Sequence, residues 1–120
     1  MSDESSPVKI DTVGDVAVVE FVQPSIVDPI VIQRLGEELY GLVEEAGHRK
    51  LVVDFSNVRF LSSQTLGVLL TLRKRSDAVG GHVHISGMKP DLHKVFKITK
   101  LDSFFDFHDT REEAVAAMEQ

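Results

Sequence analysis

Two adjacent hydroxyl side chains, Ser62 and Ser63, stand where a strand-type segment gives way to a helix-type segment. The apolar run 51–55 has the length of a strand, and residues 63–79 place their leucines at helical spacing. The first amide groups of a helix have no partner inside the helix, and the helix dipole makes that end positive. A serine at this point is therefore suited to cap the helix, bind an anion or carry a phosphate.

A phosphate at a helix start changes the surface of a protein more than its fold. The phosphate gains hydrogen bonds from the helix amides, and it adds about −1.5 to −2 charges at pH 7. A partner bound to that surface would be released by repulsion or by the cost of desolvation. The simpler interpretation is a capping serine, which stabilises a helix by about 0.5–2 kcal/mol relative to alanine. The residues alone leave both interpretations open.

Other combinations of reactive residues give weaker signals. His82 and His84 alternate on a predicted strand and share one face, but no third ligand is evident, so we predict no metal site. A hydrolase built from Ser63, a histidine and Asp54 would lack the G-x-S-x-G turn, and no G-x-x-x-x-G-K loop for ATP is present. These observations favour a protein that is not an enzyme and needs no cofactor.

Composition limits the possible partners and the number of domains. The chain has 120 residues, a net charge of −6 and no cysteine. We predict one domain over residues 8–120, preceded by a flexible tail over 1–7. The negative net charge, without a stripe of basic residues, argues against binding to nucleic acid. No apolar run reaches the roughly 20 residues that span a bilayer. The absence of cysteine and of a signal peptide favours the cytoplasm.

The elements that must position the two serines follow from hydrophobic periodicity. Predicted strands cover 8–13, 16–22, 50–55, 82–86 and 104–107. Predicted helices cover 30–46, 63–79 and 91–98, with a last helix that is capped by Asp109 or Thr110 and runs to Met118. The first two strands form a hairpin, and strands then alternate with helices. This order predicts an α/β fold with a mixed sheet of about five strands and about four helices, packed mainly on one side of the sheet or flanking it.

At the serine junction the sequence resembles a known family pattern, D-x-S/T-x-V-x-F-I/L-D-S-S/T-G-L-G-V-L. The matching residues are Asp54, Ser56, Val58, Phe60, Leu61, Ser63, Leu66, Gly67, Val68 and Leu69. Pro90 and the segments 95–102 and 104–107 continue the similarity. The pattern is similar to that of STAS domains, and within them to the bacterial anti-sigma factor antagonists. The resemblance implies the STAS-like α/β fold.

The resemblance also implies a function. In that family the serine or threonine that follows a conserved aspartate accepts a phosphate, which would make Ser63 the acceptor, with Ser62 and Thr65 as alternatives. An anti-sigma factor that is also a serine kinase binds the unphosphorylated antagonist, phosphorylates it and lets it go, and a phosphatase resets the cycle. The antagonist is then a substrate and not an enzyme. The implied contact surface comprises Ser62, Ser63, Gln64, Thr65 and Gly67.

Four single positions depart from the family pattern, and the family's G-x-[LI]-D after the second strand is also missing, with residues 21–24 in its place. Ser62 replaces the conserved aspartate, Gln64 a serine or threonine, Thr65 a glycine, and Lys100 a glycine further along the chain. A carboxylate before the acceptor would add negative charge to the surface that the kinase meets and hold the loop with charge-assisted hydrogen bonds. Its loss leaves an alternative function, a STAS scaffold or adaptor in a bacterial signalling complex that is not phosphorylated. The sequence makes no prediction of the oligomeric state.

Overall fold

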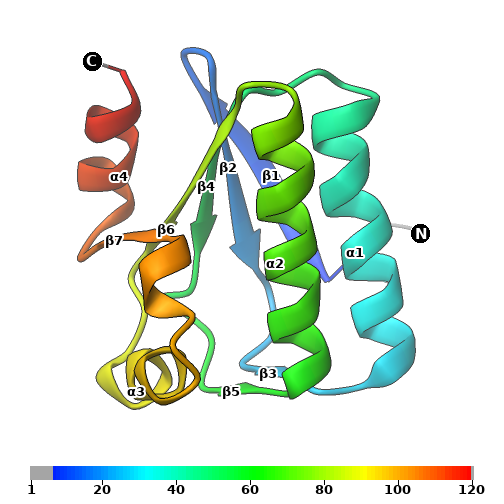
Figure 1. Cartoon of the computed structure of the whole chain (residues 1–120), viewed down its shortest axis with the longest axis vertical. Helices are drawn as coiled ribbons and strands as arrows, with labels where there is room; N and C mark the ends of the chain where they lie inside the picture. Colours follow the sequence, from blue (N-terminus) through cyan, green and yellow to red (C-terminus); the bar gives the residue numbers. More distant parts are fainter. Residues whose placement is uncertain (1–6, 120) are drawn as a thin grey trace.

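β-Branched segments of the chain pair into one five-stranded sheet in the computed structural model, which describes residues 7–119 (Figure 1). The strands are β1 (Val8–Val13), β2 (Val16–Phe21), β4 (Lys50–Asp54), β6 (His82–Ser86) and β7 (Asp106–His108), in the spatial order β1-β2-β4-β6-β7. β1 runs antiparallel to β2, and the other neighbours are parallel. The mixed α/β sheet predicted from the sequence is thus confirmed.

Helices connect the parallel strands. They are α1 (Pro29–Glu44), α2 (Ser63–Ala78) and α3 (Pro90–Ile98), and α4 (Arg111–Met118) follows the last strand. Asp28 caps α1, because its carboxylate accepts a hydrogen bond from the amide of Ile30 at 2.9 Å. Thr110, and not Asp109, caps α4 through the amide of Glu113 at 3.1 Å.

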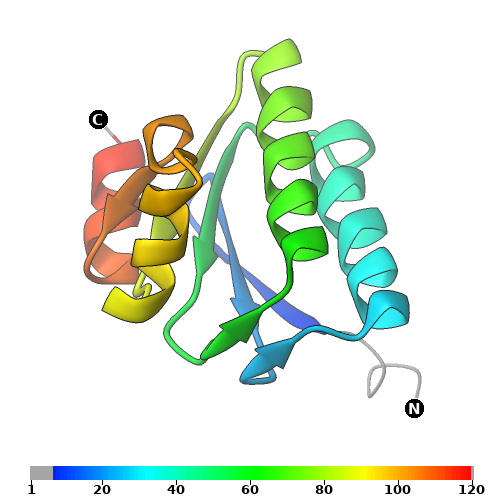
Figure 2. The same ribbon diagram turned by 60° about the horizontal axis from the view of Figure 1, so that its bottom comes forward.

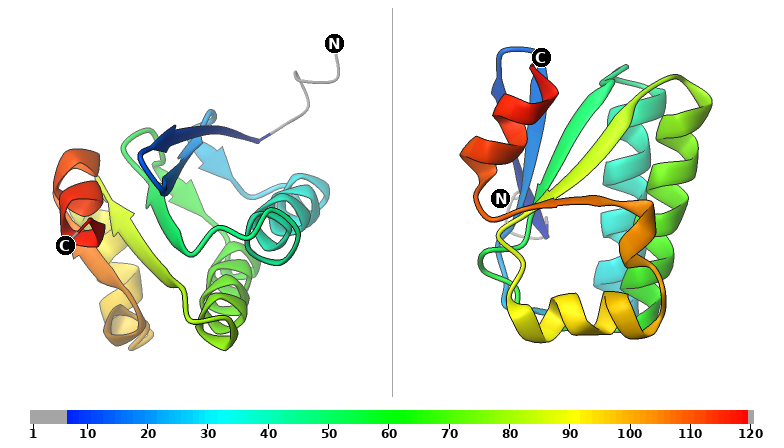
Figure 3. Two further views of the ribbon diagram at one scale, coloured as in Figure 1. Left: turned by 90° about the horizontal axis from the view of Figure 1, so that it is seen from above. Right: turned by 60° about the vertical axis from the view of Figure 1, so that its left-hand side comes forward.

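The sheet is covered on both faces (Figure 3). α1 and α2 pack together on one face, and α4 lies on the other against β2, β4, β6 and β7. The second face has a small apolar cluster of its own, formed by Val16, Val18, Val52, Ala114, Val115 and Met118. Of the two predicted arrangements, helices mainly on one side or flanking the sheet, the structure has the flanking one, because β2 and β4 carry apolar residues at consecutive positions and so require cover on both faces.

A second, two-stranded sheet was not predicted. β3 (Ser25–Ile26) runs parallel to β5 (Phe60–Leu61), and the two lie side by side below the main sheet (Figure 2). The carbonyl of Pro24 also accepts a hydrogen bond from the amide of Arg59 at 2.7 Å. Two-residue strands show no periodicity, so hydrophobic patterning does not reveal them. This small sheet places the segment that enters α2 beside the segment that enters α1.

The last strand begins later than expected. Residues 102–104, whose final residue was predicted to open the strand, form the short 3-10 helix η2 (Asp102–Phe104), and β7 starts at Asp106. Phe105 is buried, whereas Phe104 is exposed and lies under the guanidinium of Arg73, which is 5.3 Å from the ring centre. An aromatic run without alternation misled the sequence prediction at this point.

The N-terminal boundary lies at the edge of the described chain. Residues 1–6 of the predicted tail lie outside the described residues. Pro7 is buried, and its carbonyl accepts a hydrogen bond from the amide of Val22 at 3.1 Å. No helix within residues 7–119 is long and apolar enough to cross a bilayer.

The end of α3 contains a lysine in a conformation that favours glycine. Lys100 has φ +62°, and it follows the helix where Leu101 and Lys100 donate their amides back to the carbonyls of Phe96 and Lys97 at 2.8 and 3.1 Å. This is the helix ending that usually places glycine at the left-handed position. Gly80 occupies the same position after α2, with φ +77°. The lysine is therefore strained where the STAS pattern has a glycine.

We predict that Lys100→Gly stabilises the protein. A side chain in the left-handed region costs about 1–2 kcal/mol, of which the entropy of an unfolded glycine offsets part, so the free energy of unfolding should rise by about 0.5–1 kcal/mol. The converse substitution Gly80→Lys should lower it by a similar amount. Urea unfolding monitored by circular dichroism measures both. An unchanged or lower stability of Lys100→Gly would contradict the strain.

Candidate functional site

Ser62 caps α2. Its hydroxyl oxygen and its carbonyl oxygen both face the amide of Thr65, at 3.4 and 3.1 Å, and its carbonyl also accepts from the amide of Leu66 at 3.4 Å. Its own amide donates to the carbonyl of Ile26 in β3 at 3.2 Å. Ser62 is half-buried by these contacts. The capping role therefore belongs to Ser62, which holds the helix start against the small sheet.

Thr65 faces the interior. Its side chain is 0% exposed, and its hydroxyl donates a hydrogen bond to the carbonyl of Ile26 at 3.0 Å. A partner or kinase does not reach this hydroxyl unless the turn opens. Thr65 was predicted to contribute to the contact surface or to accept phosphate as an alternative to Ser63. The structure places it in the interior, where a glycine position of the family holds a buried hydrogen-bond donor.

Ser63, Gln64 and Gly67 are exposed on the first turns of α2. No described residue accepts a hydrogen bond from the amides of Ser63 and Gln64. A Cβ atom added to Gly67 would meet nothing within 4 Å, so the helix backbone is open to a close approach there. At the positive end of α2, the exposed hydroxyl is therefore that of Ser63.

Exposed apolar side chains come from the segments that flank this turn. Phe60 of β5 is 61% exposed, Ile30 at the start of α1 is 69% exposed, and Val27 between β3 and α1 is 48% exposed. These segments and the start of α2 lie at one end of the molecule (Figures 1 and 2). Large apolar groups gathered on a surface mark sites of protein contact. We refer to Val27, Ile30 and Phe60 as the apolar rim.

A buried carboxylate lies at the carboxyl end of β4, where the chain leaves toward the serine turn. Asp54 is 3% exposed and accepts hydrogen bonds from Ser56 Oγ at 2.7 and 2.8 Å, Ser86 Oγ at 3.0 Å and Arg111 Nη2 at 2.8 Å. Gly87 lies so close that an added Cβ would be 2.9 Å from the carboxylate, and its φ is +68°. This Asp54 cluster joins the ends of β4 and β6 to α4.

Electrostatics keep Asp54 ionised. Burial by itself would raise the pKa of this carboxyl, but the hydrogen bonds from Ser56, Arg111 and Ser86 and the positive charge of Arg111 outweigh it, so that the pKa lies below its ordinary value. Arg111 also pairs with Glu20 of β2 at 3.3 Å. No role was predicted from the sequence for Glu20, Ser86 or Arg111. One feature of the sequence pointed to such partners: Asp54 ends an apolar strand, and a carboxylate buried there needs hydrogen-bond donors or a positive charge nearby.

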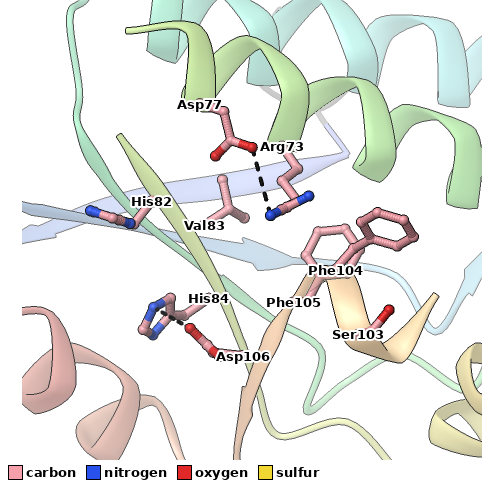
Figure 4. Close-up of a pocket in the computed structure, with 9 residues that line it drawn as sticks. All are labelled: Arg73, Asp77, His82, Val83, His84, Ser103, Phe104, Phe105 and Asp106. Carbon is pink, nitrogen blue, oxygen red and sulfur yellow. Dashed lines mark ion pairs between the residues drawn. The ribbon is translucent and has the colours of Figure 1, made fainter. Parts of the chain in front are cut away.

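A histidine pair lies on the α4 side of β6. His84 Nε2 is 3.1 Å from Asp106 Oδ2, and His84 Nδ1 is 3.0 Å from His108 Nε2. Burial lowers the pKa of His84 against the opposing charge of Asp106. Figure 4 shows His84 and Asp106 beside a polar cleft between α2 and β6, where Arg73 pairs with Asp77 of the same helix at 3.7 Å. The contacts of His84 with Asp106 and His108 connect β6 with β7.

The remaining catalytic and metal candidates do not converge. Within residues 7–119 no three or more histidine, aspartate, glutamate or cysteine side chains are arranged to hold a metal ion. His82, which sequence analysis paired with His84, is exposed. The Asp54 carboxylate is occupied by Ser56, Ser86 and Arg111, and no histidine of the described chain is hydrogen-bonded to Ser63. The elements of a Ser-His-Asp hydrolase are therefore not assembled.

The STAS domain model matches residues 8–114, and the chain belongs to this family. The protein described as "Putative anti-sigma factor antagonist BtrV" from Bordetella bronchiseptica is 33% identical over 85 residues, which are 71% of this chain and 72% of that protein.

Solved structures share the fold at low sequence identity. An anti-sigma-factor antagonist (STAS) domain protein from Planctomyces limnophilus superposes with a TM-score of 0.85 at 21% identity, covering 94% of this chain and 98% of that one. The Bacillus cell fate determinant SpoIIAA in its phosphorylated form superposes with a TM-score of 0.74 at 17% identity, covering 92% and 98%. At these identities the likeness establishes the fold alone.

We predict that Thr65→Val destabilises the protein while Ser63→Ala does not. The valine loses the hydrogen bond to Ile26, which should lower the free energy of unfolding by about 1 kcal/mol. Ser63 is exposed, so its replacement should change that free energy by less than about 0.5 kcal/mol. Urea unfolding of the two variants provides the comparison. Equal effects of the two substitutions would show that Thr65 does not anchor the turn.

We predict an acid-sensitive stability that depends on Asp54. The folded-state pKa of Asp54 lies below the unfolded value of about 3.9, so its contribution is complete above that pH and is lost as the pH falls through the folded pKa. Asp54→Asn removes this contribution and should cost about 2–3 kcal/mol at pH 7. Urea unfolding between about pH 7 and pH 3 should show a shallower loss for the variant than for the native chain. Parallel pH curves for the two proteins would contradict this role.

Proposed function

We propose that this STAS domain is an anti-sigma factor antagonist whose binding to an anti-sigma factor is controlled by phosphorylation of Ser63. The observation that carries the proposal is the exposed hydroxyl of Ser63 at the first residue of α2. It occupies the acceptor position of the family pattern. The name of the Bordetella relative and the phosphorylated form of the Bacillus neighbour support the same reading.

The neighbouring hydroxyls are poorer acceptors for physical reasons. The oxygen of Ser62 faces the helix amides as a cap, and Thr65 is buried against Ile26. A phosphate on Ser63, in contrast, lies in reach of the unpaired amides of Ser63 and Gln64 and of the helix dipole. Modification of Ser63 therefore requires no change in the packing of α2.

The contact surface consists of Ser63, Gln64 and Gly67 together with the apolar rim. The rim supplies apolar area for binding a partner, and the exposed serine supplies the switch. A phosphate places about −1.5 to −2 charges beside these apolar groups. The bound partner would then have to desolvate that charge, and the complex dissociates. The chain acts in this cycle as a substrate and binding protein, in the cytoplasm, with a serine kinase and a phosphatase as partners.

One observation favours a second function. The family aspartate is replaced by Ser62, so the turn lacks the carboxylate that precedes the acceptor serine. A STAS scaffold or adaptor that binds its partner permanently would not need this carboxylate. In that case the same surface, with Gln64 and the apolar rim, forms a constitutive contact that is indifferent to charge at Ser63.

The decisive experiment combines phosphate mapping with binding. The purified chain is incubated with the anti-sigma serine kinase of its own organism and ATP, and the phosphate is located by mass spectrometry. We expect it on Ser63. Ser63→Ala should bind the kinase as the native chain does, whereas Ser63→Asp should weaken binding at least about tenfold, measured by calorimetry.

Matched controls separate the two functions. Ser103→Asp adds the same charge at an exposed serine of η2 and should leave binding unchanged. If Ser63→Asp and Ser63→Ala bind equally well and no phosphate appears on Ser63, the scaffold function replaces the switch. If the chain does not bind the kinase in any form, antagonism of an anti-sigma factor is refuted.

A further inference from the structure

Ile10, in the middle of the edge strand β1, turns its backbone groups away from β2. Pro7 and Val22 form a hydrogen-bonded pair, because the amide of Val22 donates to the carbonyl of Pro7 at 3.1 Å. Hydrogen-bonded and non-bonded pairs alternate along an antiparallel ladder. With the register Lys9↔Glu20 and Ile10↔Val19, the backbone of Lys9 bonds to β2 and the backbone of Ile10 points away from it. The amide and carbonyl of Ile10 thus face the free edge.

Within residues 7–119 no second strand pairs with this edge, on which the amide of Thr12 is occupied by the carboxylate of Asp11. Residues 9–13 are all exposed, and Ile10 is 42% exposed. β1 lies at the rim of the sheet, with the helices set over its central strands (Figure 3). Lys9 and Asp11 form no ion pair with a described residue; Asp11 Oδ1 only accepts from the amide of Thr12 at 3.0 Å. Natural proteins usually protect such edges, so an exposed one of this length points to a partner strand.

The strand is complementary to itself in one register. If a second copy pairs antiparallel with Ile10 opposite Ile10, the outward groups of the two isoleucines form a hydrogen-bonded pair. Lys9 then lies opposite Asp11 of the other copy, and Asp11 opposite its Lys9, on the α4 face of the sheet. The two isoleucines meet on the opposite face, next to the main core. Cross-strand pairs of opposite charge and of apolar residues are both favourable.

The neighbouring registers that keep the outward groups paired are disfavoured. A shift by one step in either direction places Lys9 opposite Lys9, or Asp11 opposite Asp11. Like charges directly opposite each other destabilise a strand pair. Short, exposed strands with a nearly symmetric sequence tend to slip in register. The Lys-Ile-Asp order at residues 9–11 favours one register over its neighbours.

We propose that two copies of this chain associate through β1, in an antiparallel two-fold pairing centred on Ile10, to form a continuous ten-stranded sheet. The occupant of the free edge is a second copy, because the charge order of β1 is complementary to itself. The pairing leaves the start of α2 outside the contact, so it is independent of the function proposed for Ser63.

The test uses charge exchange at the two positions. Sedimentation equilibrium of the native chain up to about 1 mM, at about 0.15 M salt, should show dimers, since a dissociation constant as weak as about 1 mM is visible there. Lys9→Asp and Asp11→Lys should each be monomeric, because each sets like charges opposite one another twice. An equimolar mixture of these two variants should form heterodimers, and the double variant K9D/D11K should dimerise again.

Two further variants complete the design. Lys94→Asp makes the same change in net charge on the exposed surface of α3 and should leave the dimer intact. Ile10→Pro removes an amide that β2 does not use, so the monomer should fold while the dimer is lost. A native chain that stays monomeric at about 1 mM overturns the proposal. So do equal effects of Lys9→Asp and Lys94→Asp, or a mixture of the single variants that fails to associate.

Discussion

The buried carboxylate of Asp54 is the constraint on which the arrangement of this domain depends. Removing a charge from water is costly unless the group is paired and fully hydrogen-bonded. Asp54 meets this demand with one residue from each of three other segments: Ser56 in the loop toward β5, Ser86 at the end of β6, and Arg111 on α4. The position of the loop that leads to α2 is therefore fixed by the same carboxylate that holds α4 on the far face.

The serine turn is built by a separate set of contacts and so keeps its exposed hydroxyl. The carbonyl of Ile26 accepts from both the amide of Ser62 and the hydroxyl of Thr65. Ser62 and Thr65 thus hold the turn in place, whereas, within residues 7–119, the hydroxyl of Ser63 between them makes no contact that supports the turn. Under the proposed function, this division lets Ser63 be modified while the contacts of Ser62 and Thr65 that support the turn stay unchanged. It also explains why Thr65 stands where the family has glycine: the added side chain finds an acceptor inside.

The sequence predicted most of the elements, because they carry long periodic patterns. The β1–β2 hairpin, the continuous apolar strand β4 and the leucine spacing of α2 specify the mixed sheet. The small sheet of β3 and β5, the exposure of Phe104 and the placement of α4 depend on contacts between residues far apart in the chain, which local patterns do not contain. At the site, the resemblance located Ser63, but burial alone distinguished it from Thr65. The partners of Asp54 were missed because Arg111 is 57 residues away in the chain.

The separation of Asp54 and Arg111 along the chain has a consequence for the synthesis of the protein on the ribosome. At about 5–20 residues per second, Arg111 is synthesised roughly 3–11 s after Asp54. Throughout this interval β2 and β4 are already synthesised, yet the cation that neutralises the carboxylate has not been made. The nascent sheet must keep that edge in contact with water until α4 arrives. Arg111 is thus the last partner of Asp54 to be synthesised. A chain truncated before Arg111 lacks the positive charge that neutralises Asp54 at the end of the central strand β4.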